Sequence, residues 1–212
     1  TVQSTNTAIV LGASGSHVIV LTDNSTISGN TSGAISLNGT VNGAYTLTLN
    51  TTAATTFAAT VGNSAPLTAI TTNSGGTVVF NTTAISTNGA QAYGENATIS
   101  GNITFTTTNN DITFSGTVNS VSDTKTLTIV AGNGDTTFSG IVGGSEALGN
   151  TTIGTAGLTA GAFKVQGTLA ITNSAASEID GVISDGDSAG IITKAGAGTL
   201  TLSGDNTYTG AT

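Results

Sequence analysis

The residues whose chemistry could support catalysis are few in this sequence. It has no cysteine, no tryptophan, one histidine and only three basic side chains, all of them lysine. His17 lies in the apolar run His17–Leu21, which is typical of an outward position on a strand. A catalytic or metal-binding histidine needs an acid, a nucleophile or a second ligand beside it, and the sequence places none near His17. We therefore expect no catalytic residues and no enzyme activity.

One cluster of acidic residues could bind a cation. Glu178, Asp180, Asp185 and Asp187 lie within one short stretch, and Ca²⁺ prefers several oxygen ligands. Asp185 and Asp187 are the candidate calcium ligands, although Asp185–Gly190 is also typical of a solvated turn and lacks the spacing of an EF-hand. The solvated turn is the favoured interpretation, so we expect no metal and no cofactor. Two carboxylates that face one groove could instead cleave a glycan, so a polysaccharide-acting protein is an alternative.

The overall charge narrows the range of partners. Eleven acidic residues against three lysines give a formal net charge of −8. Nucleic-acid binding depends on contacts from Lys and Arg to phosphates, so this class of partner is excluded, and an anionic membrane surface is disfavoured. No apolar run reaches the about 20 residues of a membrane helix, so direct membrane insertion is not expected. The chain starts at Thr1 and has no methionine, which favours a processed product or a fragment whose targeting segment lies elsewhere.

The elements that position these residues are predicted to be strands. Threonine alternates with leucine or isoleucine in Thr46–Leu49, Thr126–Ile129 and Thr199–Leu202, which places the apolar residues on one face. Breaks rich in asparagine and glycine recur every ~8–12 residues, and no stretch keeps a helical period. Aromatic residues make up only 4% of the chain. We therefore predict an all-β fold with a thin core of small and β-branched side chains.

Internal repeats indicate how the strands are arranged. Four segments return in the same order, about 72 to about 81 residues later. They are Ser25–Asn30 with Ala97–Asn102, Ile35–Asn42 with Ile112–Asn119, Tyr45–Leu49 with Lys125–Ile129, and Thr55–Gly62 with Thr136–Gly143. A long repeat of several short strands favours a β-helix, or β-solenoid, of ~20 residues per turn and ~10 turns, forming a rod ~50 Å long. The alternative is an antiparallel β-sandwich of short strands.

The last stretch, Lys194–Thr212, resembles a known repeat. A lysine is followed by Gly196-Ala-Gly-Thr-Leu200, and then by Leu202-Ser-Gly-Asp-Asn-Thr-Tyr-Thr-Gly-Ala-Thr212. This pattern is similar to the passenger-associated transport repeat of bacterial autotransporters, although the family's repeat continues beyond the point at which this sequence stops. The resemblance implies a β-helix outside the cell of a Gram-negative-type bacterium and a role in export that is not catalytic. It divides the chain into a solenoid array, 1–180, and a truncated transport repeat, 181–212.

These observations together predict a structural or adhesive module of a large exported surface protein. A solenoid with open ends exposes unpaired strand backbone, so the expected partners are further copies of itself, joined end to end or by strand exchange into fibres or a surface layer. A host or neighbouring cell surface is the other expected partner. Two alternatives stay open, namely an enzyme with acids in one groove and a ligand- or ice-binding module with one flat threonine face.

Overall fold

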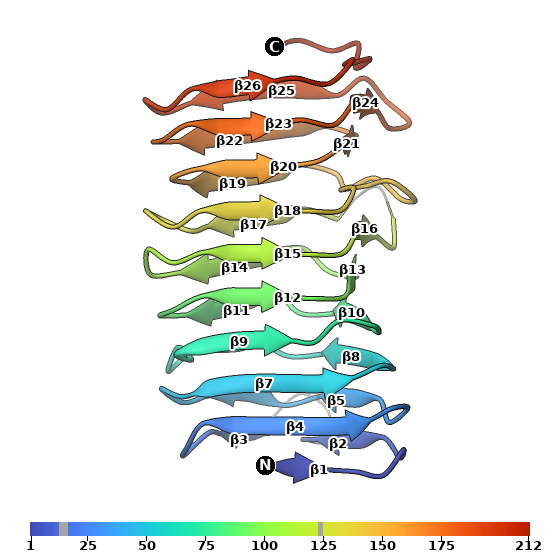
Figure 1. The fold of residues 1–212 in the computed structure, drawn as a ribbon, viewed down its shortest axis with the longest axis vertical. Helices are drawn as coiled ribbons and strands as arrows, with labels where there is room; N and C mark the ends of the chain where they lie inside the picture. The colour runs from blue at the N-terminus through green and yellow to red at the C-terminus, as the bar shows by residue number, and fades with distance from the viewer. Residues whose placement is uncertain (13–16, 123–124) are drawn as a thin grey trace.

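The computed structural model describes residues 1–12, 17–122 and 125–212. In these residues the chain forms 26 strands and no helix, so none of them belongs to a helix that could span a membrane. Every pairing between the strands is parallel. The strands are stacked as the turns of a solenoid around three sheets (Figure 1). The predicted all-β solenoid is confirmed, and the antiparallel sandwich is excluded.

Sheet A follows the whole length of the rod and has ten strands. In spatial order they are β1 (Val2–Gln3), β4 (Ser25–Asn30), β7 (Thr46–Thr51), β9 (Ala69–Thr72), β12 (Gln91–Tyr93), β15 (Ile112–Phe114), β18 (Thr136–Phe138), β20 (Leu158–Ala160), β23 (Ser177–Ile179) and β26 (Leu200–Leu202). Because neighbouring strands lie about 4.8 Å apart, this sheet spans roughly 43 Å.

Sheets B and C complete each turn. Sheet B contains β2 (Ile9–Leu11), β5 (Ile35–Leu37), β8 (Ala54–Phe57), β10 (Thr77–Phe80), β13 (Asn96–Ile99), β16 (Val118–Ser120) and, beyond a single bridge at Val142, β21 (Phe163–Val165) and β24 (Ile183–Asp185). Sheet C contains β3 (Val18–Val20), β6 (Thr40–Asn42) and, beyond a bridge at Val61, β11 (Ala84–Thr87), β14 (Ile103–Thr107), β17 (Leu127–Val130), β19 (Thr151–Thr155), β22 (Thr168–Asn173) and β25 (Ile191–Ala195).

Aromatic rings fill the centre of the solenoid. All six phenylalanines of the sequence and Tyr93 are buried there. Phe57 and Phe80 are aligned in sheet B with ring centroids 5.5 Å apart, and Phe114 and Phe138 are aligned in sheet A at 5.2 Å. The few aromatic residues are thus concentrated at aligned inward positions. The core is therefore not made of small and β-branched side chains alone, as the composition suggested.

Side-chain oxygens of asparagine and aspartate join successive turns at the corners. The Asn150 Oδ1 atom accepts a hydrogen bond from the Thr168 backbone N–H at 3.0 Å. Asp111 accepts one from the Asp135 N–H at 2.9 Å, and the Asp135 carboxylate accepts one from the Gly157 N–H at 2.8 Å. Such bonds link residues 18 to 26 positions apart. They satisfy backbone donors where the sheet ladders are interrupted.

Glycine dominates the corner at which the chain passes from sheet A to sheet B. We define the corner column as the residues two positions before a set of aligned residues in sheet B. Its members are Thr7, Gly33, Ala53, Gly76, Glu95, Gly116, Gly140, Gly161, Gly181 and Gly204. A Cβ atom at Gly140 would lie 2.5 Å from the carbonyl oxygen of Gly116 in the turn before it. Most turns pass too close to their neighbours here to leave room for a side chain.

The repeated segments of the sequence occupy different faces of the solenoid. Ser25–Asn30 forms β4 in sheet A, whereas the matching Ala97–Asn102 begins in β13 of sheet B. Similarly, Tyr45–Leu49 contributes to sheet A and Lys125–Ile129 to sheet C. The matched segments are therefore similar strands placed on different sheets.

Candidate functional surface

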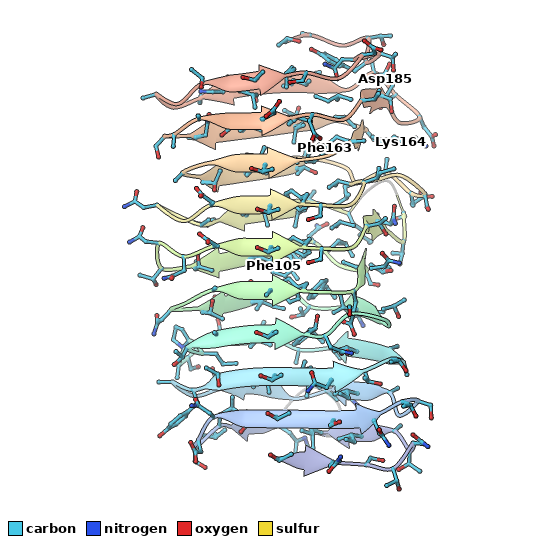
Figure 2. The ribbon with its side chains drawn as sticks, in the orientation of Figure 1. Phe105, Phe163, Lys164 and Asp185 are labelled. Carbon is cyan, nitrogen blue, oxygen red and sulfur yellow. The ribbon has the colours of Figure 1, made fainter. Side chains whose placement is uncertain are left out.

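The acidic residues between 178 and 187 lie along the outside of two successive strands. Glu178 faces outward from β23, where its Oε1 atom accepts a hydrogen bond from the Ser203 hydroxyl at 2.7 Å. Asp180 follows β23, and Asp185 ends β24 at the outer edge of the rod (Figure 2). Among the residues that the structure describes, no three acidic or histidine side chains form a group that could hold a metal ion. The expectation that no metal binds here, with Asp185 and Asp187 as the weaker calcium alternative, stays a prediction.

The Asp185 carboxylate is surrounded by donors of the protein itself. Its Oδ1 atom accepts a hydrogen bond from the Gly190 N–H at 2.8 Å, and its Oδ2 atom accepts the Thr209 N–H at 3.0 Å and the Thr209 hydroxyl at 2.7 Å. The Gly190 N–H and then the Thr209 hydroxyl hold the pKa of Asp185 below its ordinary value. Asp187 contributes its backbone N–H to the Gln166 Oε1 atom at 2.6 Å. Asp185 therefore fastens the last residues of the chain to the preceding turn.

His17 directly precedes β3 in the first turn, and β3 lies at the other end of the rod from β23 and β24 (Figure 1). Its side chain is exposed, as the sequence predicts. Its backbone carbonyl accepts a hydrogen bond from the Thr40 N–H at 2.9 Å. The fold therefore does not bring His17 together with the acidic residues of β23 and β24.

Glu95 is the ionisable residue that the sequence analysis missed. It takes the place of a glycine in the corner column, and its side chain is only 1% exposed. Neither carboxylate oxygen has a hydrogen-bond partner among the described residues. Burial raises the pKa of Glu95 to about 7, partly offset by the nearby Thr72 and Thr55 hydroxyls. A sequence signal existed, because Gly94-Glu95 stands where Ser115-Gly116 and Ser139-Gly140 occur in later turns.

A single column of threonines runs along the outer face of sheet A. The strand register aligns nine outward positions, of which only Ala92 and Glu178 are not threonine. The threonine column consists of Thr26, Thr48, Thr71, Thr113, Thr137, Thr159 and Thr201. Sheet B has no such uniformity, because Val10, Ser36, Thr56 and Val79 alternate at its equivalent positions. Sheet A thus presents a hydroxyl-bearing surface with one acidic residue, Glu178, among the nine aligned positions.

The C-terminal segment forms the last turn of the same solenoid. Leu200, Leu202 and Tyr208 pack against the core. The Asn206 Oδ1 atom accepts a hydrogen bond from the Ile183 N–H at 2.8 Å, and the Tyr208 N–H donates to the Ile183 carbonyl at 3.2 Å. Sheets A, B and C therefore continue without interruption from the residues before 180 to those after it.

The comparisons with known proteins identify this last turn. The family model of the passenger-associated-transport-repeat matches residues 192–212, which comprise most of β25, β26 and the segment that follows. Together with the parallel solenoid, this match fits a segment of an autotransporter passenger, and such a repeat implies export to the cell surface. No curated protein and no solved structure matches the chain.

Proposed function

We propose that this chain is a structural and adhesive module of an exported bacterial surface protein. The observation that carries the proposal is the continuous ten-stranded sheet A, whose last strand belongs to the transport repeat. In a solenoid each turn contacts only its neighbours, so the molecule extends in one direction and presents long lateral faces. Such a rod holds a binding surface away from the cell.

The interior of the rod is suited to mechanical load. Stacked and edge-to-face ring contacts run from Phe57 to Phe163, and the parallel ladders and the corner hydrogen bonds recur along the rod. Among the carboxylates described above, Glu95 lies inside the solenoid, Glu178 faces outward from β23, and Asp185 is held by the Gly190 N–H and the Thr209 N–H and hydroxyl. This distribution supports a role that is not enzymatic.

The partners that we propose follow from the surface and the charge. A net charge of −8 without arginine argues against nucleic acid. The uncharged threonine column favours contact with a host or neighbouring cell surface, and the open strand edges favour contact with further copies of this chain. The location that we propose is the outer surface of a Gram-negative-type bacterium.

Surface display tests this function. The chain would be inserted in frame into an autotransporter passenger in a Gram-negative host, with an unrelated β-solenoid of similar length as the control. We expect the chain to be removed by protease added to intact cells, and the displaying cells to aggregate or adhere more strongly than the control cells. Retention of the chain inside the cell, or adhesion equal to that of the control, would contradict the proposal.

A further inference from the structure

A hollow of about 360 Å³ lies on the outer surface, where the chain leaves sheet C towards sheet A. Val130, Gly154 and Thr172 line it at three aligned outward positions on successive turns. Asn133, Ser174 and Gly196 line it from the adjoining corners. The hollow thus extends over four turns, roughly 14 Å along the rod. Its volume is within the usual range of small-molecule sites, about 300–1,000 Å³.

Gly154 keeps this hollow open. Only two glycines lie inside the described strands, and a Cβ atom at the other one, Gly29, would collide with the Gly33 backbone. At Gly154 the nearest atom to a Cβ would be the Ile129 carbonyl oxygen at 3.6 Å, and the backbone has no positive φ. Neither a steric contact nor a positive φ therefore requires glycine at position 154. Glycine also weakens a strand, so its presence here needs another explanation. A glycine within a strand often marks a bulge, a tight bend or the close approach of a ligand or another backbone, and β19 keeps an unbroken register with both of its neighbours.

The lining indicates the chemistry of that molecule. None of the described lining residues is ionisable, so the hollow favours a neutral ligand. The Val130 side chain and the half-buried Cα of Gly154 offer an apolar floor, while Asn133, Thr172 and Ser174 offer an amide and two hydroxyls. The hollow is open to solvent, so it cannot enclose an apolar ligand as a buried pocket does. A ligand with one apolar face and outer hydroxyl groups that stay hydrated satisfies all three conditions.

We propose that this hollow binds a neutral glycan, with the C–H face of a pyranose ring on Val130 and Gly154 and its hydroxyls on Asn133, Thr172 and Ser174. Four stacked turns accommodate a short run of sugar units along the rod axis. The hollow lacks an aromatic platform, so each contact is weak, and repeated copies on a cell surface would supply the avidity. This inference rests on the proposed adhesive function and names its ligand class.

Saturation-transfer NMR on the full 212-residue chain tests the proposal, with maltose, cellobiose, lactose, chitobiose and mannobiose as the probes. We expect ring C–H signals from at least one of these sugars. Gly154→Val fills the hollow with a good strand former and should lower the signal at least tenfold. The matched control is Ala170→Val, which also places a valine at an outward position of a sheet C strand, but outside the hollow. This variant should leave the signal unchanged.

Two further variants cover the case in which Gly154→Val does not fold. Thr172→Val and Asn133→Ala each remove a polar group from the surface and should lower the signal at least threefold. The proposal is overturned if no sugar of the panel binds, or if binding survives in all three variants. It is also overturned if Gly154→Val abolishes self-association measured by light scattering, because the hollow is then a contact between protein chains. A chain that is displayed and adheres but fails these tests would retain its structural role without this site.

Discussion

At the scale of single residues, Glu95 is the least expected feature of the core. Its carboxyl occupies the space beside Gly76, where a Cβ atom at residue 76 would lie 3.1 Å from the Glu95 Oε1 atom. A charged carboxylate without hydrogen bonds is costly to bury, so the folded state holds the neutral acid. The unfolded chain releases this proton near the ordinary pKa of 4.5, whereas the folded chain retains it until about pH 7.

The consequence is a pH dependence of stability that one substitution removes. The folded state binds more protons than the unfolded state between pH 4.5 and about 7. Glu95 therefore supports folding below pH 4.5, and this contribution is lost as the pH rises to about 7. Glu95→Gln should abolish this loss of stability with rising pH, because glutamine does not titrate. Urea denaturation of the unmodified chain and of the Glu95→Gln variant across this pH range isolates the effect. The other carboxylates contribute equally to both unfolding free energies and cancel when one is subtracted from the other. A difference in unfolding free energy that does not change with pH would contradict the buried, protonated state.

At the scale of the elements, the corners decide which residues can be accommodated. Gly140 and Gly161 occupy the same position of the corner column in adjacent turns. A Cβ atom at Gly140 would meet the Gly116 carbonyl oxygen at 2.5 Å, but at Gly161 the nearest atom is the Ser139 carbonyl oxygen at 3.7 Å. Neither glycine has a positive φ. Steric contact therefore excludes a side chain at Gly140 but not at Gly161.

This contrast predicts opposite results for the same substitution. Gly140→Ala should destabilise the fold by about 2 kcal/mol, because the methyl group forces two turns apart. Gly161→Ala should be neutral or stabilise it by about 0.5 kcal/mol, because alanine restricts the unfolded chain. Thermal unfolding followed by circular dichroism measures both variants. Equal destabilisation of the two variants would show that the turns are not packed as closely as described.

The corner hydrogen bonds predict a second difference between elements. Removing the Asn150 side chain leaves the Thr168 N–H without its acceptor, so Asn150→Ala should cost about 1 kcal/mol. Asn150→Asp keeps an acceptor oxygen at the same place and should cost much less, since Asp111 and Asp135 serve naturally in this role. The unfolding free energies of the two variants from urea titration test this ordering. The interpretation fails if aspartate is as damaging as alanine.

The strands were predictable from the sequence, but their distribution over the three sheets was not. Alternation in Thr46–Leu49 and Thr126–Ile129 predicts strands with threonine outward; the first lies within β7, and the second forms most of β17 from Leu127 on. Sheet assignment depends on the lengths of the corners, which vary between turns, so Ser25 and its repeat counterpart Ala97 are on different sheets. Burial of Glu95 and the hollow at Gly154 depend on that same register. The signal at Glu95 emerges only when Gly94-Glu95 is aligned with Ser115-Gly116 of the next turn, and that alignment requires the register.

At the scale of the whole molecule, the two ends of the isolated chain have complementary edges. Alternate residues of a parallel strand direct their N–H and C=O groups to the same neighbour. Ser4 donates to the Ser28 carbonyl in β4, so the backbone of Gln3 faces away from the stack. At the other end, Thr199 and Ser203 bond to β23, so Leu200 and Leu202 face away. β1 of one copy can therefore extend sheet A of another copy beyond β26.

A contact between the β1 end of one copy and the β26 end of another is head-to-tail. Such a contact leaves a free end on each copy, so it builds filaments rather than discrete dimers. The isolated 212-residue chain should therefore associate with rising concentration, as seen by analytical ultracentrifugation and as fibres in electron micrographs. Gln3→Pro removes the N–H that the next copy would bind and is tolerated in an edge strand, so it should suppress association without unfolding the rod. Gln3→Ala keeps that N–H and should associate like the unmodified chain. A strictly monomeric chain at high concentration, or equal association of the proline variant, would show that β1 and β26 do not pair between copies.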